Sequence, residues 1–230
     1  MGPSLNNILG PFTLSTTNTF VGAGYTGADT LTISGKDVKV DGFSFAGVSS
    51  PSKGNYGIRV SQRLRFGHFN PAPSENITIS NNTVTGYLHG ILIDGAKSAT
   101  VDGNTVTSSQ GNALSIQNVP GSSTYSVTDN NLSDAGGVAL TIGKVNDPGL
   151  TLTLLRNNFN GSRWGASLNN ILGPFTLSTT NTFVGAGHNG GTTLLISGKD
   201  VKVDGFKFGA LNGGVGIFVS DRTLFGHAVT

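Results

Sequence analysis

The 230-residue sequence contains no cysteine, and only 11 % of its residues are charged. The absence of cysteine excludes disulfide bridges and thiolate metal sites. No apolar run reaches the roughly 18 residues that a transmembrane helix requires, so no membrane span is expected. The net charge is only +2, and lysines share segments with acids, as Lys36 does with Asp37. A nucleic-acid surface requires clustered basic residues, so nucleic acid is not an expected partner.

Glycine, by contrast, is abundant, with 35 residues, and hydrophobic residues make up 36 % of the chain. Helix-forming residues dominate no window, whereas residues that favour strands and turns recur throughout. This composition favours a folded, β-rich chain with many turns over a disordered one.

A long repeat organises the chain. The segment SLNNILGPFTLSTTNTFVGAG occurs at residues 4–24 and again at 167–187, and ISGKDVKVDGF occurs at 33–43 and 196–206. We therefore predict one continuous domain over residues 4–230, made of a full unit (4–166) and a partial second unit (167–230). Residues 1–3 are interpreted as residues added during cloning.

A shorter repeat, with a period of about 23 residues, lies within the long one and combines alternating apolar residues with an Asn or Asp at a bend. The bend residues form the predicted ladder: Asn18, Asp41, Asn82, Asn104, Asn130, Asn157, Asn181 and Asp204. The residues two positions later are apolar and form the predicted core stack: Phe20, Phe43, Val84, Val106, Leu132, Phe159, Phe183 and Phe206. Asn tolerates left-handed backbone angles and its amide can bond neighbouring coils, so the pattern predicts a parallel β-helix with stacked asparagines. Leucine-rich repeats are disfavoured because their L-x-x-L-x-L spacing is absent.

The segment ITISNNTVTGYLHGILIDG resembles the repeat of right-handed parallel β-helix proteins, the pectate-lyase-like superfamily, and VDGFSF and VDGFKF are similar to coils of that group. The resemblance implies an all-β, right-handed parallel β-helix, here of about eight coils. The resemblance is specific for the fold and weak for an activity, because the motif forms the scaffold of the solenoid. It also implies that lyase or hydrolase activity must be considered, with acidic calcium ligands and a basic residue, or with paired carboxylates.

The outward positions of the strand that would line such a groove argue against an enzyme. Aligned on Leu92, they contain one charge and no carboxylate: Thr32, Arg59, Leu92, Ser115, Thr141, Ser167, Leu195 and Phe218. The next outward row contains a single acid: Ser34, Ser61, Asp94, Gln117, Gly143, Asn169, Ser197 and Ser220. The sequence thus leaves enzymatic activity undecided but favours none, and no metal or cofactor is expected.

Five side chains remain candidates for contact with a ligand such as carbohydrate: Arg59, Arg65, His68, Asp94 and Trp164. Arg65 and His68 lie in the insertion QRLRFGHFNPAP, where they could bind a sugar carboxylate and transfer a proton. A loop that merely covers the coil explains the same residues, and the second copy has Leu224 in place of Arg65. Trp164 could stack on a sugar or cover a coil edge.

The near-identical copy suggests that length itself is the function, because the stability of a solenoid is roughly additive over neighbouring units. We predict a structural or adhesive module of a long bacterial surface or secreted protein, acting as a stalk or filament. Its partners would be neighbouring repeats of the same chain, with end-to-end association of copies as a further expectation. The alternative is a β-helix that binds or degrades polysaccharide.

Overall fold

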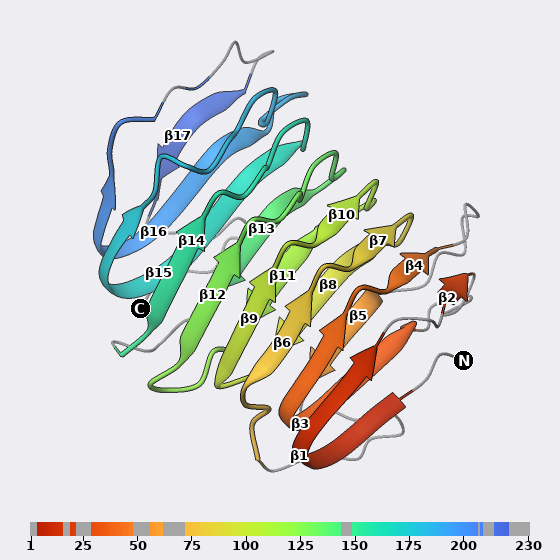
Figure 1. Ribbon diagram of the computed structural model, residues 1–230. Helices are drawn as coiled ribbons and strands as arrows, with labels where there is room; N and C mark the ends of the chain where they lie inside the picture. The colour runs from red at the N-terminus through yellow and green to blue at the C-terminus, as the bar shows by residue number, and fades with distance from the viewer. Residues whose placement is uncertain are drawn as a thin grey trace.

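The computed structural model describes residues 4–15, 19–21, 29–47, 56–61, 72–143, 149–206, 208 and 214–220. Every regular element among these residues is a β-strand, and the strands of successive coils stack along one axis (Figure 1). The strand pairs are parallel on each face of the stack. The predicted all-β parallel β-helix is therefore confirmed.

The first face of the solenoid contains five short strands and the opening parts of four long ones. The short strands are β5 (Tyr56–Ser61), β8 (His89–Asp94), β11 (Leu114–Gln117), β13 (Val138–Gly143) and β17 (Val215–Val219). The long strands are β1 (Ser4–Ser15), β3 (Leu31–Asp41), β15 (Trp164–Leu177) and β16 (Thr192–Val203).

The second face contains the closing parts of the long strands, together with β6 (Ile77–Ser80), β9 (Ser98–Asp102), β12 (Thr124–Thr128) and β14 (Thr151–Leu155). Because the long strands continue around the corner, the first two faces form a single 13-stranded sheet. The corner is tight at Gly35, whose φ is +142°. A Cβ there would lie 2.4 Å from the carbonyl oxygen of Ile8, so only glycine fits.

The third face is narrower. Its strands are β2 (Thr19–Val21), β4 (Ser44–Ala46), β7 (Thr83–Thr85) and β10 (Thr105–Thr107). Single parallel bridges then continue the column from Thr105 through Asn131 and Asn158 to Thr182. All three faces thus stack coil upon coil.

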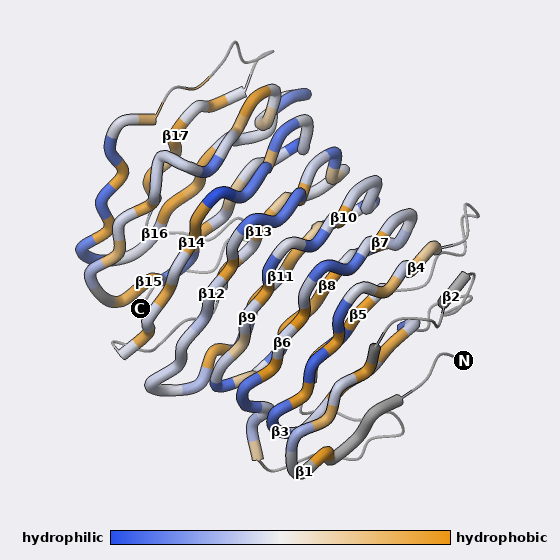
Figure 2. Tube along the Cα trace, viewed as in Figure 1, coloured by the Kyte–Doolittle hydropathy of each residue, from blue (hydrophilic) through white to orange (hydrophobic). Residues whose placement is uncertain are grey.

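Inward-pointing side chains fill the coil, and Figure 2 shows hydrophobic and hydrophilic positions alternating along the strands. On the third face the buried column consists of Phe45, Val84, Val106, Leu132, Phe159 and Phe183. The core stack read from the sequence requires one correction, because Phe45 and not Phe43 pairs with Val84. Phe206 is half-buried against Phe183. The backbone of Phe20 pairs with that of Phe45, but the side chain of Phe20 lies outside the described part.

One repeat unit corresponds to six coils. The strand path of the first face runs from β1 through β3, β5, β8, β11 and β13 to β15, which opens the second copy. In the first copy Ser4 lies opposite Thr32, and in the second Ser167 lies opposite Leu195. The fold has about six turns, against the predicted eight coils.

Candidate functional site

The outer surface of the first face has the register that the sequence predicted. Thr32, Arg59, Leu92, Ser115, Thr141, Ser167, Leu195 and Phe218 form one continuous column. Most of the column is buried, including Leu92 at 3 % and Ser167 at 1 % exposure. This column therefore presents few reactive groups.

Arg59 is engaged in an ion pair. Its Nη1 lies 3.2 Å from Oδ2 of Asp29, whose side chain is only 6 % exposed. The guanidinium also lies over the ring of Tyr56, with Cζ 5.9 Å from the ring centroid. Because Arg59 neutralises a buried carboxylate, its first role is structural.

Asp94, the one acid of the next outward row, accepts hydrogen bonds from neighbouring coils. Asn118 Nδ2 donates to Oδ1 at 2.6 Å, and Ser61 Oγ donates to Oδ2 at 3.4 Å. The structure places Arg59 and Asp94 on adjacent strands but gives them no shared contact among the described residues. No pair of carboxylates is assembled by the described members of these two rows, so they form no acid–base site.

An aromatic column lies at the start of the same strands and was missed in the sequence. The rings of Tyr56 and His89 stack with centroids 5.2 Å apart, and Asn112, Val138 and Trp164 continue the column. The sequence signal that could have revealed it is an aromatic or polar residue two positions before most of the inward aliphatics, as with Tyr56 before Ile58 and His89 before Ile91.

His89 is fixed within this column. Its Nδ1 accepts a hydrogen bond from the backbone N–H of Asn112 at 3.0 Å. Burial lowers the pKa of His89 below its ordinary value. At neutral pH the ring is therefore uncharged and acts as an acceptor and a stacking surface.

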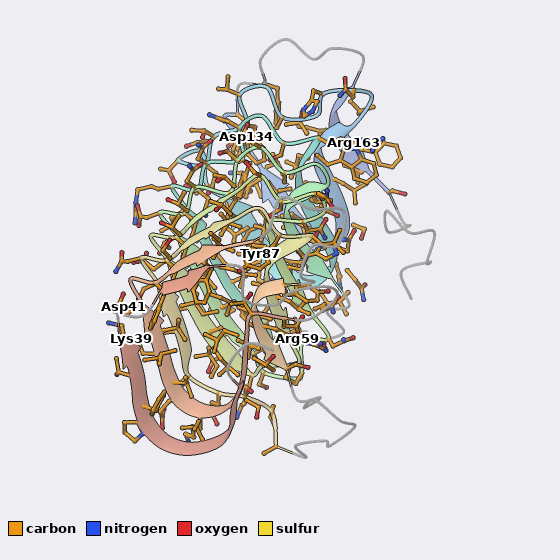
Figure 3. All side chains as sticks on the ribbon, turned by 90° about the vertical axis from the view of Figure 1, so that its right-hand side faces the viewer. Lys39, Asp41, Arg59, Tyr87, Asp134 and Arg163 are labelled. Atoms are coloured by element: carbon orange, nitrogen blue, oxygen red, sulfur yellow. The ribbon has the colours of Figure 1, made fainter. Side chains whose placement is uncertain are left out.

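Trp164, the last of the five candidates with a described position, lies farther along the aromatic column. The guanidinium carbon of Arg163 lies 5.9 Å from its ring centroid. Figure 3 shows Arg163 and Arg59 at different heights of the solenoid. Arg65 and His68 lie outside the described residues. The structure therefore does not bring the three described candidates, Arg59, Asp94 and Trp164, together.

The bend between the second and third faces contains the asparagine ladder. Asn104 is fully buried, and its Oδ1 accepts hydrogen bonds from N and Nδ2 of Asn82 at 3.0 and 2.9 Å. Its Nδ2 donates to the carbonyl of Ile79 and to Oδ1 of Asn130. The same pattern repeats from Asn130 to Asn157 and from Asn157 to Asn181. Asn18 lies outside the described residues.

Two predicted ladder members, Asp41 and Asp204, are not part of it. Asp41 lies opposite Ser80, two positions before Asn82, and Phe43 occupies the ladder position, where its N–H donates to Asn82 Oδ1 at 2.9 Å. Asp204 is 72 % exposed and pairs with Lys202. Asp41 was assigned to the ladder because it lies two residues before Phe43, just as Asn82 lies two residues before Val84. The strand pairing instead aligns Phe43 with Asn82.

The left-handed backbone angle also lies one residue earlier than predicted. Residues with positive φ immediately precede five of the six described ladder positions: Gly42, Asn81, Gly103, Asp129 and Arg156. The ladder asparagines therefore serve through their amides, and the preceding residue makes the bend.

Asp41 has a separate role on the outer side of this bend. Hydrogen bonds from Ser80 and Asn81, with Lys39 nearby, lower the pKa of Asp41 to about 2. Lys39 and Asp41 lie together on one flank of the solenoid, away from Arg59 (Figure 3). This is a structural cluster that ties β3 to β6.

Comparison with known proteins identifies the family. A family model described as "Periplasmic copper-binding protein (NosD)" matches residues 52–189, more than half of the chain. The chain belongs to this family. No curated protein and no solved structure matches the chain. The family description places NosD proteins in the periplasm, which agrees with a periplasmic or surface β-helix module. Among the described residues, no helix is long and apolar enough to cross a membrane.

The copper binding in the family's description does not fit the described residues of this chain. Copper(I) prefers sulfur ligands, and the sequence has no cysteine and a single methionine, Met1. In the described part, no group of three or more His, Cys, Asp or Glu side chains could hold a metal. His89, the best-placed imidazole, already uses Nδ1 in a hydrogen bond and its ring in a stack.

Proposed function

We propose that the chain is a structural repeat module of a long surface or secreted protein, in which the number of units sets the length of a stalk or filament. The observation that carries the proposal is the junction between the two copies, where the second unit continues the solenoid in phase with the first. A module of this kind can be added any number of times without a new interface.

The junction has the same types of contact as the interior of a unit. On the first face, Leu140 lies opposite Ala166, and Ile142 lies opposite Leu168. At the ladder, the backbone N–H and Nδ2 of Asn157 donate to Oδ1 of Asn181 at 2.9 and 3.0 Å. A buried polar ladder and an apolar interior therefore both cross the boundary between copies, which supports a rigid connection.

The unit length then follows from the coil spacing. Neighbouring parallel strands lie about 4.8 Å apart, so six coils extend the solenoid by roughly 29 Å. The outer surface supports the same role, since hydroxyl, amide and scattered ion-paired groups form it and the two outward rows contain no catalytic pair.

An adhesive role towards carbohydrate is the second candidate, and the aromatic column favours it. Tyr56, His89 and Trp164 share one edge of the first face, and aromatic faces are suitable surfaces for the apolar side of a sugar ring. Binding of the 230-residue protein to neutral and uronic-acid glycans, compared with a Trp164→Ala variant, tests this role.

The structural role is tested with proteins containing one, two and three additional 163-residue units inserted in phase. Small-angle X-ray scattering and electron microscopy should show rods whose length grows by about 29 Å per unit at constant cross-section. A matched control carries insertions half a coil out of phase, which break the ladder and the strand register together. Arrays that fold into flexible beads, or that lengthen equally with the out-of-phase insertions, contradict the proposal.

A further inference from the structure

The segment Ile196–Phe206 repeats Ile33–Phe43 letter for letter, but the two copies have different neighbours. In the first unit the far edge of this segment pairs with β6: Lys39 lies opposite Thr78 and Asp41 opposite Ser80. In the second unit β17 pairs with the opening part of β16, and no described strand pairs with the far edge of its closing part. We call Ile196–Phe206 the docking edge.

In the first unit, backbone and side-chain groups along this edge form hydrogen bonds with the next coil. The N–H groups of Asp37 and Gly42 donate to the carbonyls of Glu75 and Ser80, each at 3.0 Å. Phe43 N–H donates to Asn82 Oδ1. Side chains add to the pairing, with Asn76 Nδ2 donating to Asp37 Oδ1 at 2.8 Å, Ser80 Oγ to Asp41 Oδ1 at 2.7 Å and Lys36 Nζ 3.7 Å from Glu75.

Among the described residues, the docking edge is less covered than its counterpart in the first unit. Val38 and Val40 are 1 % and 0 % exposed, whereas Val201 and Val203 are only half-buried. Beside them lies a hollow of about 400 Å³, which Ile217 and Val219 also line. The side chain of Asp204 is 72 % exposed, compared with 28 % for Asp41.

The open copy already has the backbone of the paired copy. Asp37 and Asp200 both have a φ of +57°, and Gly42 and Gly205 have φ values of +74° and +73°. Binding to this edge would therefore require little ordering of its backbone, which favours affinity.

From this internal comparison we propose that the docking edge binds one specific occupant, a parallel strand with the sequence of Glu75–Asn82, ENITISNN. The 230 residues contain this octapeptide once, and β6 already uses it. In an array the occupant is a further stretch of the same repeat, so assembly proceeds by strand addition, with main-chain bonds giving affinity and the Ile77 and Ile79 side chains giving selectivity. The inference rests on the proposed repeat function and names the contact that continues the array.

Amide hydrogen exchange of the full 230-residue chain tests this proposal with an internal standard. The two 11-residue segments are identical, so their intrinsic exchange rates are equal, and differences report pairing alone. The amides to compare are those of Asp200, Gly205 and Phe206 with those of Asp37, Gly42 and Phe43. A synthetic peptide of residues 74–86 is the ligand, and a peptide with Ile77→Lys and Ile79→Lys is the matched control.

With the native peptide, exchange at the three second-unit amides should slow saturably, by at least about tenfold, while the first-unit amides stay unchanged. A second arm appends residues 62–107 after Ser220 in place of residues 221–230, with the same lysine variant as control. The proposal is supported if amide exchange slows in either arm and does not slow with the corresponding lysine control. No slowing in both arms, or equal slowing with the controls, overturns it.

Failure of this test and failure of the stalk function are distinguishable. If arrays lengthen in phase while the docking edge takes up no strand in either arm, the function stands and the named occupant is wrong. If the strand docks but inserted units do not lengthen the rod, the named occupant is correct and the stalk function is wrong.

Discussion

Asn157 in the first repeat unit and Asn181 in the second are joined by two hydrogen bonds, both to Oδ1 of Asn181. Asn157 in turn accepts from N and Nδ2 of Asn130 and donates to the carbonyl of Val127. The ladder therefore connects the two copies through buried amides that have almost no access to water.

Substitution Asn157→Ala should lower the free energy of unfolding by roughly 3 kcal/mol, because it leaves buried amide and carbonyl groups of two adjacent coils without partners. Urea denaturation measures this loss. Asn131→Ala is the matched control, since Asn131 is half-buried and its Oδ1 accepts one hydrogen bond, from Asn158. A loss of about 1 kcal/mol or less is expected for the control. Equal losses in the two variants would contradict a special role for the ladder.

The ion pair of Asp29 and Arg59 is replaced as a pair in the second unit. Thr192 and Phe218 occupy the corresponding positions, and Val215 replaces Tyr56. We expect Arg59→Phe alone to cost about 3 kcal/mol, because the buried carboxylate of Asp29 loses its guanidinium. The double variant Asp29→Thr/Arg59→Phe should recover most of that loss. A double-mutant cycle measures the coupling, and strictly additive effects would show that the two substitutions are independent.

Stability should fall as the pH drops below about 6.5 because of His89. Burial lowers the pKa of His89 in the folded chain, so the unfolded chain binds a proton first. The contribution is complete above the unfolded pKa and is lost as pH falls from there towards the folded pKa. Urea midpoints at pH 7.5, 6.5 and 5.5 measure the slope. His89→Gln should flatten it, and an unchanged slope in that variant would assign the effect to another group.

Asp41 gives a second pH dependence, in acid. Its folded pKa of about 2 lies below the ordinary value of 3.8, chiefly because of the hydrogen bond from Ser80. Its stabilising contribution is therefore complete above pH 3.8 and is lost as pH falls through 2. Acid unfolding of the native chain and of Ser80→Ala, followed by circular dichroism, should show a higher midpoint pH for the variant. Coincident acid transitions would contradict this link.

Gly35 should not tolerate a side chain. Its φ is +142°, and an added Cβ would lie 2.4 Å from the carbonyl oxygen of Ile8, so Gly35→Ala is expected to cost about 3 kcal/mol. Gly121→Ala is the control, because an added Cβ there would meet nothing within 4 Å. Thermal denaturation of the two variants compares them, and similar midpoints would show that the corner relaxes freely.

The sequence predicted the coil architecture because period-2 alternation and the recurrent asparagine depend on local spacing alone. The outward column through Arg59 and Leu92 was predicted in full for the same reason. The ladder positions around Phe43 could not be predicted, since the ladder is defined by pairing between coils 39 residues apart. The role of Arg59 also depends on Asp29, which lies in the neighbouring coil three residues before Thr32, the residue opposite Arg59. The repeat spacing does not reveal this diagonal contact.

Phe43 has a consequence for folding. The six described ladder positions comprise five amides, at Asn82, Asn104, Asn130, Asn157 and Asn181, and one phenyl ring, at Phe43. Near-identical neighbours are prone to wrong pairing during synthesis. A slip by one coil would place the phenyl ring of Phe43 where a ladder amide needs hydrogen-bond partners. Phe43 therefore disfavours every misaligned pairing of coils except a shift by a whole repeat unit.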